Sequence, residues 1–339
     1  MSDLIQASLA EIRARLAGGD VSAEAVAKAC LDRIAETEPS IHALITVREQ
    51  ALEEARALDA QGPDASKPLW GVPVTVKDAI VTKGTRTTAG SKILGGFNPF
   101  YDAFVVERLK AAGAVIVGKN NMDEFAMGSS TENSAFGPTR NPRDPERIPG
   151  GSSGGSAASV AANQCYASLG TDTGGSIRLP AGWCGLYGIR STQGQSDISG
   201  IYPRAASLDT VGAMARSARD IDLLLQILAD PPLRDTLRAS APIRYLRIGV
   251  FPELVRAKGS PEVIEAYAEA VGRWEEFGEC IPVGLPLLDD PAVVDSVGTI
   301  RSYEFARDIR KDIEGNPFAG KMHPVPLADY KNGQQATPE

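Results

Sequence analysis

The sequence predicts an α/β fold with a mostly parallel or mixed sheet. Short apolar runs typical of buried strands alternate with segments of helical periodicity, which is the pattern of a layered α/β protein. The chain has 339 residues, 43% of them hydrophobic, so a sizeable core can form. No internal repeat or long low-complexity tract interrupts the alternation.

The N-terminal part is expected to consist of two helices. Gly18 and Gly19 stop the first, and Ser22 is a good N-cap for the second. A loop at 61–68 then separates a helical segment over 1–60, packed on the core, from a larger domain over 61–339. The apolar faces of the two helices are Ile5, Leu9, Ile12 and Leu16, and Val26, Cys30 and Ile34.

Strands and helices alternate through the rest of the chain. A buried strand at Val74–Val76 is expected to end at Lys77 and a second strand to run over Val115–Val117; between them, Asp102 is expected to cap a helix that Gly113 ends, with Val105, Leu109 and Ala112 on one face. Further on, a helix is expected to start at Ser260 and Pro261 and to end before Gly278. A strand at Ile281–Val283 follows it. From about Gly315 the sequence is polar and predicts no element, so the sheet is expected to keep an open edge.

Composition excludes several classes of function. The net charge of -8 argues against a broad non-specific nucleic-acid surface. The cysteines include no Cys-x-x-Cys pair, so zinc and dithiol redox sites are not expected, and no cofactor is implied. The sequence shows no apolar signal core and no membrane-length apolar stretch, which predicts a cytoplasmic protein. The four cysteines are Cys30, Cys165, Cys184 and Cys280.

Two glycine-flanked serine clusters carry the chemistry. Ser176 follows Gly174 and Gly175, where the backbone can bend sharply and direct N–H groups at one point. Ser152 and Ser153 lie between two glycine pairs, ahead of a helix over 156–162. Two other interpretations stay open: a glycine turn that binds an anion such as phosphate, and a Ser153 that is only a helix N-cap. The Walker and Rossmann glycine patterns are absent.

Lys77 is the candidate base. The only histidines are His42 and His323, so a serine hydrolase built on these clusters would need a base other than imidazole. A lysine at the end of a buried strand has its pKa lowered by desolvation, which makes the neutral amine available. The alternative is a lysine that extends to the surface.

Together these residues resemble the amidase signature family. Lys77, Ser152 and Ser176 match its Lys–cis-Ser–Ser triad in type and separation, and the blocks at 150–156 and 170–178 match its serine- and glycine-rich motifs. The resemblance implies α/β/α layers, a mixed sheet covered by helices on both faces, and hydrolysis of a carboxamide. It also implies an oxyanion hole from backbone N–H groups and supporting roles for three residues. The oxyanion-hole residues are Thr173, Gly174, Gly175 and Ser176, and the supporting residues are Ser153, Asp172 and Arg178.

Within this family, residues 69–180 are most similar to the A subunits of glutamyl-tRNA(Gln)/aspartyl-tRNA(Asn) amidotransferases, above all at 121–137. That similarity implies glutamine hydrolysis and ammonia transfer to B- and C-type partner subunits. Net charge and the lack of a membrane-length apolar stretch predict no direct contact with nucleic acid or membrane. The similarity places substrate binding at Met127, Gly128 and Ser129.

The resemblance weakens after about residue 189. Residues 190–195 read Arg-Ser-Thr-Gln-Gly-Gln where the family usually has Lys-Pro-Thr or Arg-Pro-Thr, and related chains run longer. Three functions therefore stay open: a glutaminase subunit of a tRNA-dependent complex, a stand-alone small-amide amidase, and a catalytically inactive scaffold. The chain alone is expected to be of low stability and weakly active at best.

Overall fold

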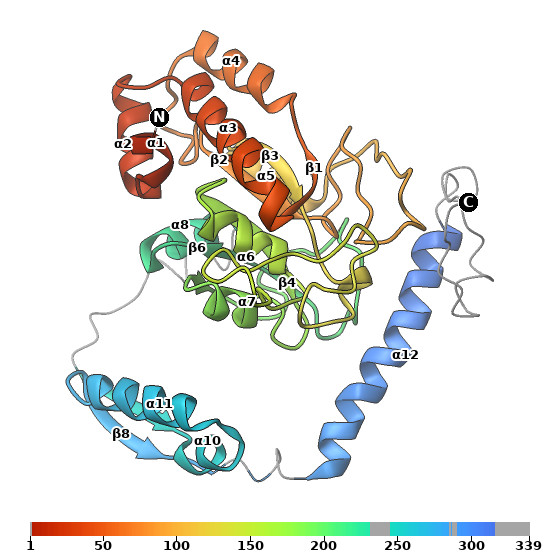
Figure 1. Cartoon of the computed structure of the whole chain (residues 1–339). Coiled ribbons are helices and arrows are strands. Elements are labelled where there is room, and N and C mark those ends of the chain that lie inside the picture. Colours follow the sequence, from red (N-terminus) through yellow and green to blue (C-terminus); the bar gives the residue numbers. More distant parts are fainter. Residues whose placement is uncertain (1, 231–244, 285, 287–289, 316–339) are drawn as a thin grey trace. The chain divides into compact units, whose positions relative to one another are not determined.

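The computed structural model describes residues 2–230, 245–284, 286 and 290–315 (Figure 1). The chain forms two compact units. The first comprises Met1–Arg234 and Tyr303–Glu339, and the second comprises Asp235–Ser302. The predicted division near residue 60 stays a prediction.

The first unit is built on a six-stranded sheet in the order β1-β3-β2-β4-β6-β5. Strand β2 is parallel to both of its neighbours, β3 and β4, whereas the outer pairings are antiparallel. The predicted α/β fold with a mixed sheet is therefore confirmed. The strands are β1 (Leu44–Val47), β2 (Pro73–Lys77), β3 (Val115–Asn120), β4 (Ala167–Asp172), β5 (Tyr187–Gly188) and β6 (Thr210–Ala215).

Helices cover both faces of this sheet. Successive side chains of a strand point to opposite faces. On one face of β2, the Thr75 hydroxyl lies 3.1 Å from Ser159 Oγ of α6. On the other face, Val74 and Val76 belong to a core that includes α5 and α8. The helices are α1 (Ser2–Gln6), α2 (Leu9–Gly18), α3 (Ala23–Ile41), α4 (Ala51–Gln61), α5 (Phe104–Ala111), the 3₁₀ turn η1 (Glu124–Ala126), α6 (Gly154–Ala161), α7 (Arg178–Trp183), α8 (Ala218–Leu228) and α12 (Pro291–Gly315), whose second half belongs to this unit.

Sheet topology brings the two candidate motifs together. Because β2 and β4 are adjacent and parallel, their carboxyl ends meet at the same edge of the sheet. Lys77 ends β2 and Asp172 ends β4, so the base and the second serine loop leave the sheet side by side.

The N-terminal elements differ from the prediction. The first predicted helix is two helices, because Ser8 forms a capping box with Glu11 and starts α2 after a break. Ser22 does cap α3, as predicted, by accepting the N–H of Ala25 at 3.1 Å. Strand β1 and helix α4 were not predicted.

Asp102 is not the N-cap of α5. That position is Ala103, and the Asp102 carboxylate instead accepts the backbone N–H of Lys83 at 2.7 Å and pairs with Lys110 at 2.7 Å. The capping prediction is wrong here because the carboxylate is used by two other donors, the Lys83 N–H and the Lys110 ammonium, which a local sequence pattern does not reveal.

The second unit contains a parallel pair of strands, β7 (Leu246–Val250) and β8 (Gly278–Pro282), joined through α10 (Pro252–Lys258) and α11 (Pro261–Trp274). Helix α11 begins at Pro261, as predicted. Strand β8 begins at Gly278 and ends at Pro282, whereas the sequence predicts a strand at Ile281–Val283. Helix α12 was not predicted, and residues 316–339 lie outside the described residues.

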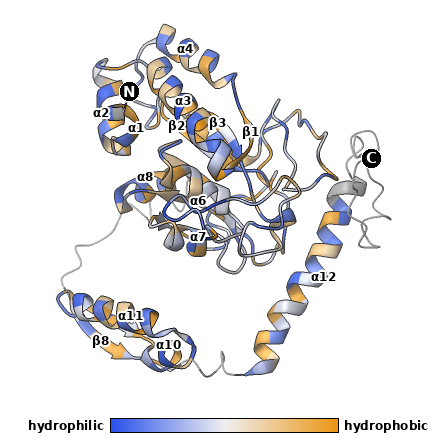
Figure 2. Cartoon of the chain, in the orientation of Figure 1, coloured by the Kyte–Doolittle hydropathy of each residue, from blue (hydrophilic) through white to orange (hydrophobic). Residues whose placement is uncertain are grey.

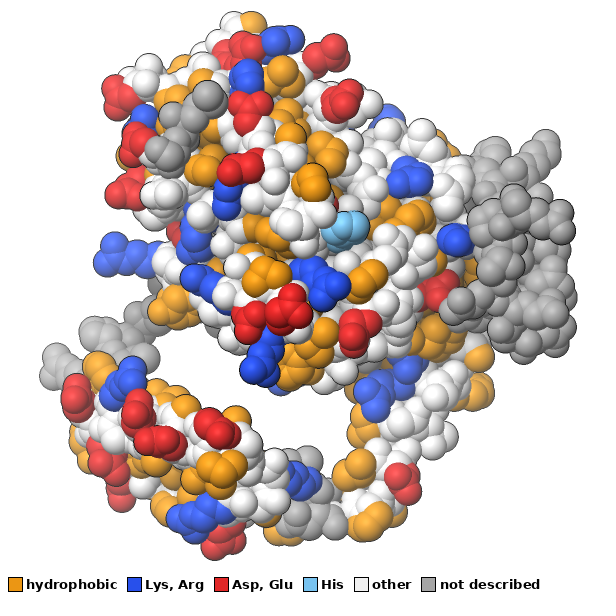
Figure 3. All heavy atoms as spheres, viewed as in Figure 1, with side chains coloured by type: hydrophobic (Ala, Val, Ile, Leu, Met, Phe, Trp, Pro, Cys, Tyr) orange, Lys and Arg blue, Asp and Glu red, His pale blue; other side chains and the backbone are white. Residues whose placement is uncertain are grey.

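Hydropathy follows the packing. Hydrophilic and hydrophobic bands alternate along α4 in Figure 2, as expected for a helix that buries one face, here with Ala51 and Ala55. On the face shown in Figure 3, positive and negative side chains of the described residues are interspersed and form no broad positive patch. Among the helices that the structure describes, none is long and apolar enough to cross a membrane.

Candidate active site

Lys77 is completely buried at the carboxyl end of β2. Its Nζ donates hydrogen bonds to Ser152 Oγ at 2.7 Å and to Thr171 Oγ1 at 2.9 Å. Burial lowers the pKa of Lys77 to about 7, although the carboxylates of Asp123, Asp209 and Asp172 oppose the shift. The structure therefore places a lysine that can be neutral near pH 7 directly beside a serine hydroxyl.

Ser152 is held in the turn before α6. The Gly151–Ser152 peptide bond is cis, and the Ser152 side chain is completely buried. The flanking glycines are needed because other chain segments approach closely. A Cβ at Gly155 would lie 2.4 Å from the carbonyl oxygens of Ala43 and Asn121.

Ser176 lies in the loop between β4 and α7 and is partly exposed. Its carbonyl accepts the N–H of Ser153 at 3.1 Å, which ties the two serine loops together. Its hydroxyl makes no hydrogen bond to any residue that the structure describes. Gly175 has a φ of 123°, a conformation that favours glycine, so the residue type before Ser176 is set by the bend.

Asp172 organises this loop. Its carboxylate accepts the N–H groups of Gly175 at 2.7 Å and Ile177 at 3.1 Å, and it pairs with the Arg178 guanidinium at 3.1 Å. Burial alone would raise the pKa of Asp172, but the hydrogen bonds from Arg178 and the two N–H groups hold it below its usual value. Arg190 Nε adds a longer ion pair at 3.6 Å. Asp172 and Arg178 thus lie where a supporting role requires them.

The backbone N–H groups predicted to form an oxyanion hole are not equivalent. The N–H of Gly175 is already donated to Asp172. Within the described part of the chain, the N–H groups of Thr173, Gly174 and Ser176 have no acceptor. Three of the four predicted donors are therefore free to bind a ligand.

Ser153 does not use its hydroxyl as a helix cap. Although it occupies the N-cap position of α6, its Oγ donates to the Thr171 carbonyl at 3.1 Å. The hydroxyl therefore links the first serine loop to the end of β4.

Sequence reasoning missed three residues at this site. Thr171 binds Lys77 directly, and Thr173 Oγ1 donates to Asp209 Oδ1 at 2.5 Å. Asp123 donates its N–H to the Ser152 carbonyl at 3.3 Å. A signal existed only for Thr171, which lies within the glycine-rich motif at 170–178 and immediately precedes Asp172. Asp123 and Asp209 are distant in sequence from both motifs.

The segment predicted to bind substrate follows η1. Met127 is half-buried, and Gly128 and Ser129 are exposed. A Cβ at Gly151 would lie 2.8 Å from the carbonyl carbon of Ser129, so this segment packs against the peptide that precedes Ser152. Its role in substrate binding stays a prediction.

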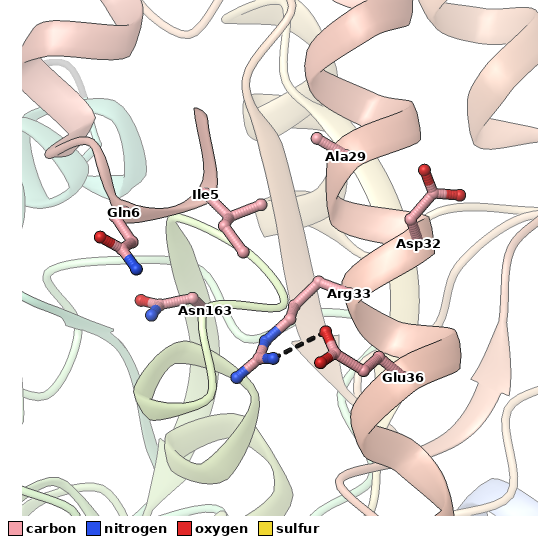
Figure 4. Close-up of a pocket in the computed structure, with 7 residues that line it drawn as sticks. All are labelled: Ile5, Gln6, Ala29, Asp32, Arg33, Glu36 and Asn163. Atoms are coloured by element: carbon pink, nitrogen blue, oxygen red, sulfur yellow. Dashed lines mark hydrogen bonds and ion pairs between the residues drawn. The ribbon is translucent and has the colours of Figure 1, made fainter. Parts of the chain in front are cut away.

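A separate surface pocket of about 540 Å³ lies between α1 and α3. Figure 4 shows Arg33 and Glu36 paired along α3, with Asn163 opposite them, and no member of the Lys77–Ser152–Ser176 group lines it. In the described residues no group of His, Cys, Asp and Glu side chains could hold a metal ion.

Loss of the Asp172 carboxylate should disturb both stability and the serine loop. In Asp172→Ala, two N–H groups lose their acceptor, and each such loss costs about 1–3 kcal/mol where the group stays buried. We expect a lower urea midpoint and a fall of roughly 10- to 100-fold in kcat/KM for amide hydrolysis, because the free N–H donors lose their alignment. Asp64→Ala, in an exposed loop, is the control. If kcat/KM is unchanged in Asp172→Ala, a supporting role for Asp172 in catalysis is ruled out.

Comparison with known proteins identifies close similarities over nearly the whole chain. A family profile described as Amidase matches residues 25–331. The A subunit of glutamyl-tRNA(Gln) amidotransferase from Nitratidesulfovibrio vulgaris is 49% identical over 97% of this chain and 70% of its own length. The same-named protein of Thermus thermophilus is 49% identical over 79% of this chain and 58% of its own length.

Solved structures of amidase-family proteins have a similar fold. The structure of the A subunit of glutamyl-tRNA(Gln) amidotransferase from Thermotoga maritima has a TM-score of 0.75 at 32% identity, covering 97% of this chain and 69% of that one. The peptide amidase of Stenotrophomonas maltophilia has a TM-score of 0.82 at 34% identity, covering 98% of this chain and 72% of that one. The chain spans between 58 and 70% of the length of the curated relatives that it matches.

Proposed function

The chain belongs to the amidase family, and from this premise we propose that it hydrolyses carboxamides with Ser176 as nucleophile, Ser152 as proton relay and Lys77 as base. The observation that carries the proposal is the 2.7 Å hydrogen bond between a buried lysine and Ser152, whose neighbour Ser153 binds the carbonyl of Ser176, a serine with no hydroxyl partner among the described residues. Burial lowers the pKa of Lys119 as well as that of Lys77, but Lys119 pairs with the Asp78 carboxylate, whereas Lys77 contacts the hydroxyls of Ser152 and Thr171, as a base in a proton relay would.

The reaction begins with attack of Ser176 Oγ on the amide carbon. The hydroxyl proton passes to Ser152 Oγ, and the Ser152 proton passes to neutral Lys77. The carbonyl oxygen becomes an oxyanion, which the N–H groups of Thr173, Gly174 and Ser176 bind. The relay then returns a proton to the leaving nitrogen, ammonia departs, and water hydrolyses the acyl-enzyme by the same path in reverse.

We propose glutamine as the substrate and a complex with B- and C-type subunits as the working form. Support comes from the curated relatives, whose names describe the A subunit of a glutamyl-tRNA(Gln) amidotransferase. A cytoplasmic location belongs to the same proposal. A second candidate, a stand-alone amidase, is favoured by the similarity to a peptide amidase with a TM-score of 0.82.

Ammonia release from a panel of amides distinguishes these functions. The chain is assayed with glutamine, asparagine and C-terminally amidated dipeptides, alone and with purified B- and C-type subunits of a relative. We expect glutamine to be the preferred substrate and the partners to raise its turnover. Faster hydrolysis of amidated peptides without partners would support the stand-alone amidase, and no turnover of any amide would support the inactive scaffold.

A further inference from the structure

Asp123 places a carboxylate against the peptide that carries Ser152. Its N–H donates to the Ser152 carbonyl at 3.3 Å, and its Oδ1 accepts the N–H of Thr131 at 2.9 Å. The other oxygen, Oδ2, is buried and has no hydrogen-bond partner among the described residues. The Oδ1 side of the carboxylate is therefore tied to the loop at Thr131, and Oδ2 has no donor at hydrogen-bond distance among the described residues. Burial raises the pKa of Asp123, and the N–H of Thr131, the charge of Lys77 and the N–H groups of Ser130 and Asn133 oppose that shift.

Two glycines make room for this carboxylate. A Cβ at Gly151 would lie 2.1 Å from Asp123 Oδ2, and a Cβ at Gly128 would lie 2.4 Å from Asp123 Cγ. Any larger residue at either position would displace the carboxylate, because real Cβ atoms do not approach this closely. The Asp123 side chain thus sits between the predicted substrate segment and the turn that holds Ser152.

Three carboxylates act on Lys77: Asp123 foremost, then Asp209 and Asp172. Asp172 is neutralised by the guanidinium groups of Arg178 and Arg190. Both oxygens of Asp209 accept hydrogen bonds, from Thr173 Oγ1 and from backbone N–H groups. Within the described residues, Asp123 is the one carboxylate of the three with an oxygen that has no donor at hydrogen-bond distance.

We infer that Asp123 is a positioning residue that acts through Lys77, supplying the negative charge that stabilises the ammonium form of the lysine each time it takes the proton from Ser152. A buried ammonium is unfavourable without a countercharge. The hydroxyls of Ser152 and Thr171, which contact Lys77 Nζ, are neutral and cannot provide one. This inference rests on the proposed function, in which Lys77 is the base.

The test uses Asp123→Asn, which keeps the shape and an oxygen for Thr131 but removes the charge. An opposite charge nearby raises the pKa of a lysine, so its removal should lower the pKa of Lys77 and move the rising limb of kcat/KM to lower pH by about one unit. The plateau of kcat/KM should fall about tenfold, because the ammonium formed in the reaction loses its countercharge. A role in folding alone would lower the amount of active protein without moving the limb.

Asp220→Asn is the matched control, since Asp220 is a buried carboxylate on α8 whose Oδ2 also has no hydrogen-bond partner in the described part of the chain. In this variant, the pH at which kcat/KM rises should equal that of the wild type. If kcat/KM of Asp123→Asn rises at the same pH as in the wild type, the inference is overturned. If Asp123→Asn does not fold, Asp123→Ser replaces it, and failure of both to fold would assign the carboxylate to folding and overturn the inference as well.

A second readout does not depend on activity. The side-chain amine of Lys77 can be titrated by NMR in protein labelled with [ε-¹³C]lysine, with Lys77→Arg to assign its signal. A lower pKa in Asp123→Asn than in the wild type supports the inference even if no amide is hydrolysed, in which case only the proposed function fails. Hydrolysis by the wild type with equal Lys77 pKa values in both proteins sustains the function and overturns the inference.

Discussion

Ser176→Ala is expected to lower kcat for amide hydrolysis by roughly 10³-fold or more while leaving the fold intact. The hydroxyl is the proposed nucleophile, and no other group replaces the bond that it forms to the acyl carbon. The fold should be unaffected because the Ser176 hydroxyl makes no hydrogen bond within the described residues, whereas its carbonyl contact to Ser153 is backbone and stays. Ammonia release and the thermal midpoint are measured on the same preparation.

The matched control is Ser66→Ala, which removes an exposed hydroxyl in the loop between α4 and β2. Its activity and thermal midpoint should equal those of the wild type. Retention of more than a few per cent of wild-type turnover by Ser176→Ala would rule out Ser176 as the nucleophile.

Lys77→Ala is expected to lower kcat/KM by roughly 10²- to 10⁴-fold and to remove its dependence on pH near neutrality. The neutral amine is the active form, and burial lowers the pKa of Lys77 to about 7. Wild-type kcat/KM should therefore rise as pH increases through about 7 and then level off. Below that pH the lysine carries a proton and cannot accept another from Ser152.

Lys77→Arg tests whether Lys77 acts as a base or only supplies a positive charge. An arginine stays protonated throughout the accessible range, so this variant should be as inactive as Lys77→Ala at every pH. A rising limb near pH 7 that persists in either variant would assign the titration to a different group.

The sequence was sufficient to predict the fold class and the type of chemistry. Local patterns carry that information: apolar runs mark β2 and β3, and the glycine–serine motifs mark the two loops. Lys77, Ser152 and Ser176 were predicted to be catalytic without the structure, because their types and spacing match a specific family pattern; that role stays a prediction. The structure joins Lys77 to Ser152 and brings the Ser153 N–H to the Ser176 carbonyl.

What sequence could not predict depends on contacts between distant segments. The Asp123 N–H reaches the Ser152 carbonyl, and its carboxylate lies against Gly151, only because the loop after β3 packs against this turn. Gly175 looks equivalent to its neighbours in the motif, yet Asp172 takes its N–H. The break between α1 and α2 follows from the cap at Ser8, where a local signal outweighed a continuous apolar periodicity.

The most direct test of the central claim is the pH dependence of acyl-enzyme formation, followed by rapid quench and peptide mass spectrometry. The chain is mixed with glutamine, stopped in acid within the first turnover, and digested. We predict a glutamyl adduct on Ser176, formed at a rate that rises with pH through about 7 in the wild type. An adduct on another residue, or a Ser176 adduct whose rate does not change across that range, would contradict nucleophilic catalysis by Ser176 with neutral Lys77 as the base.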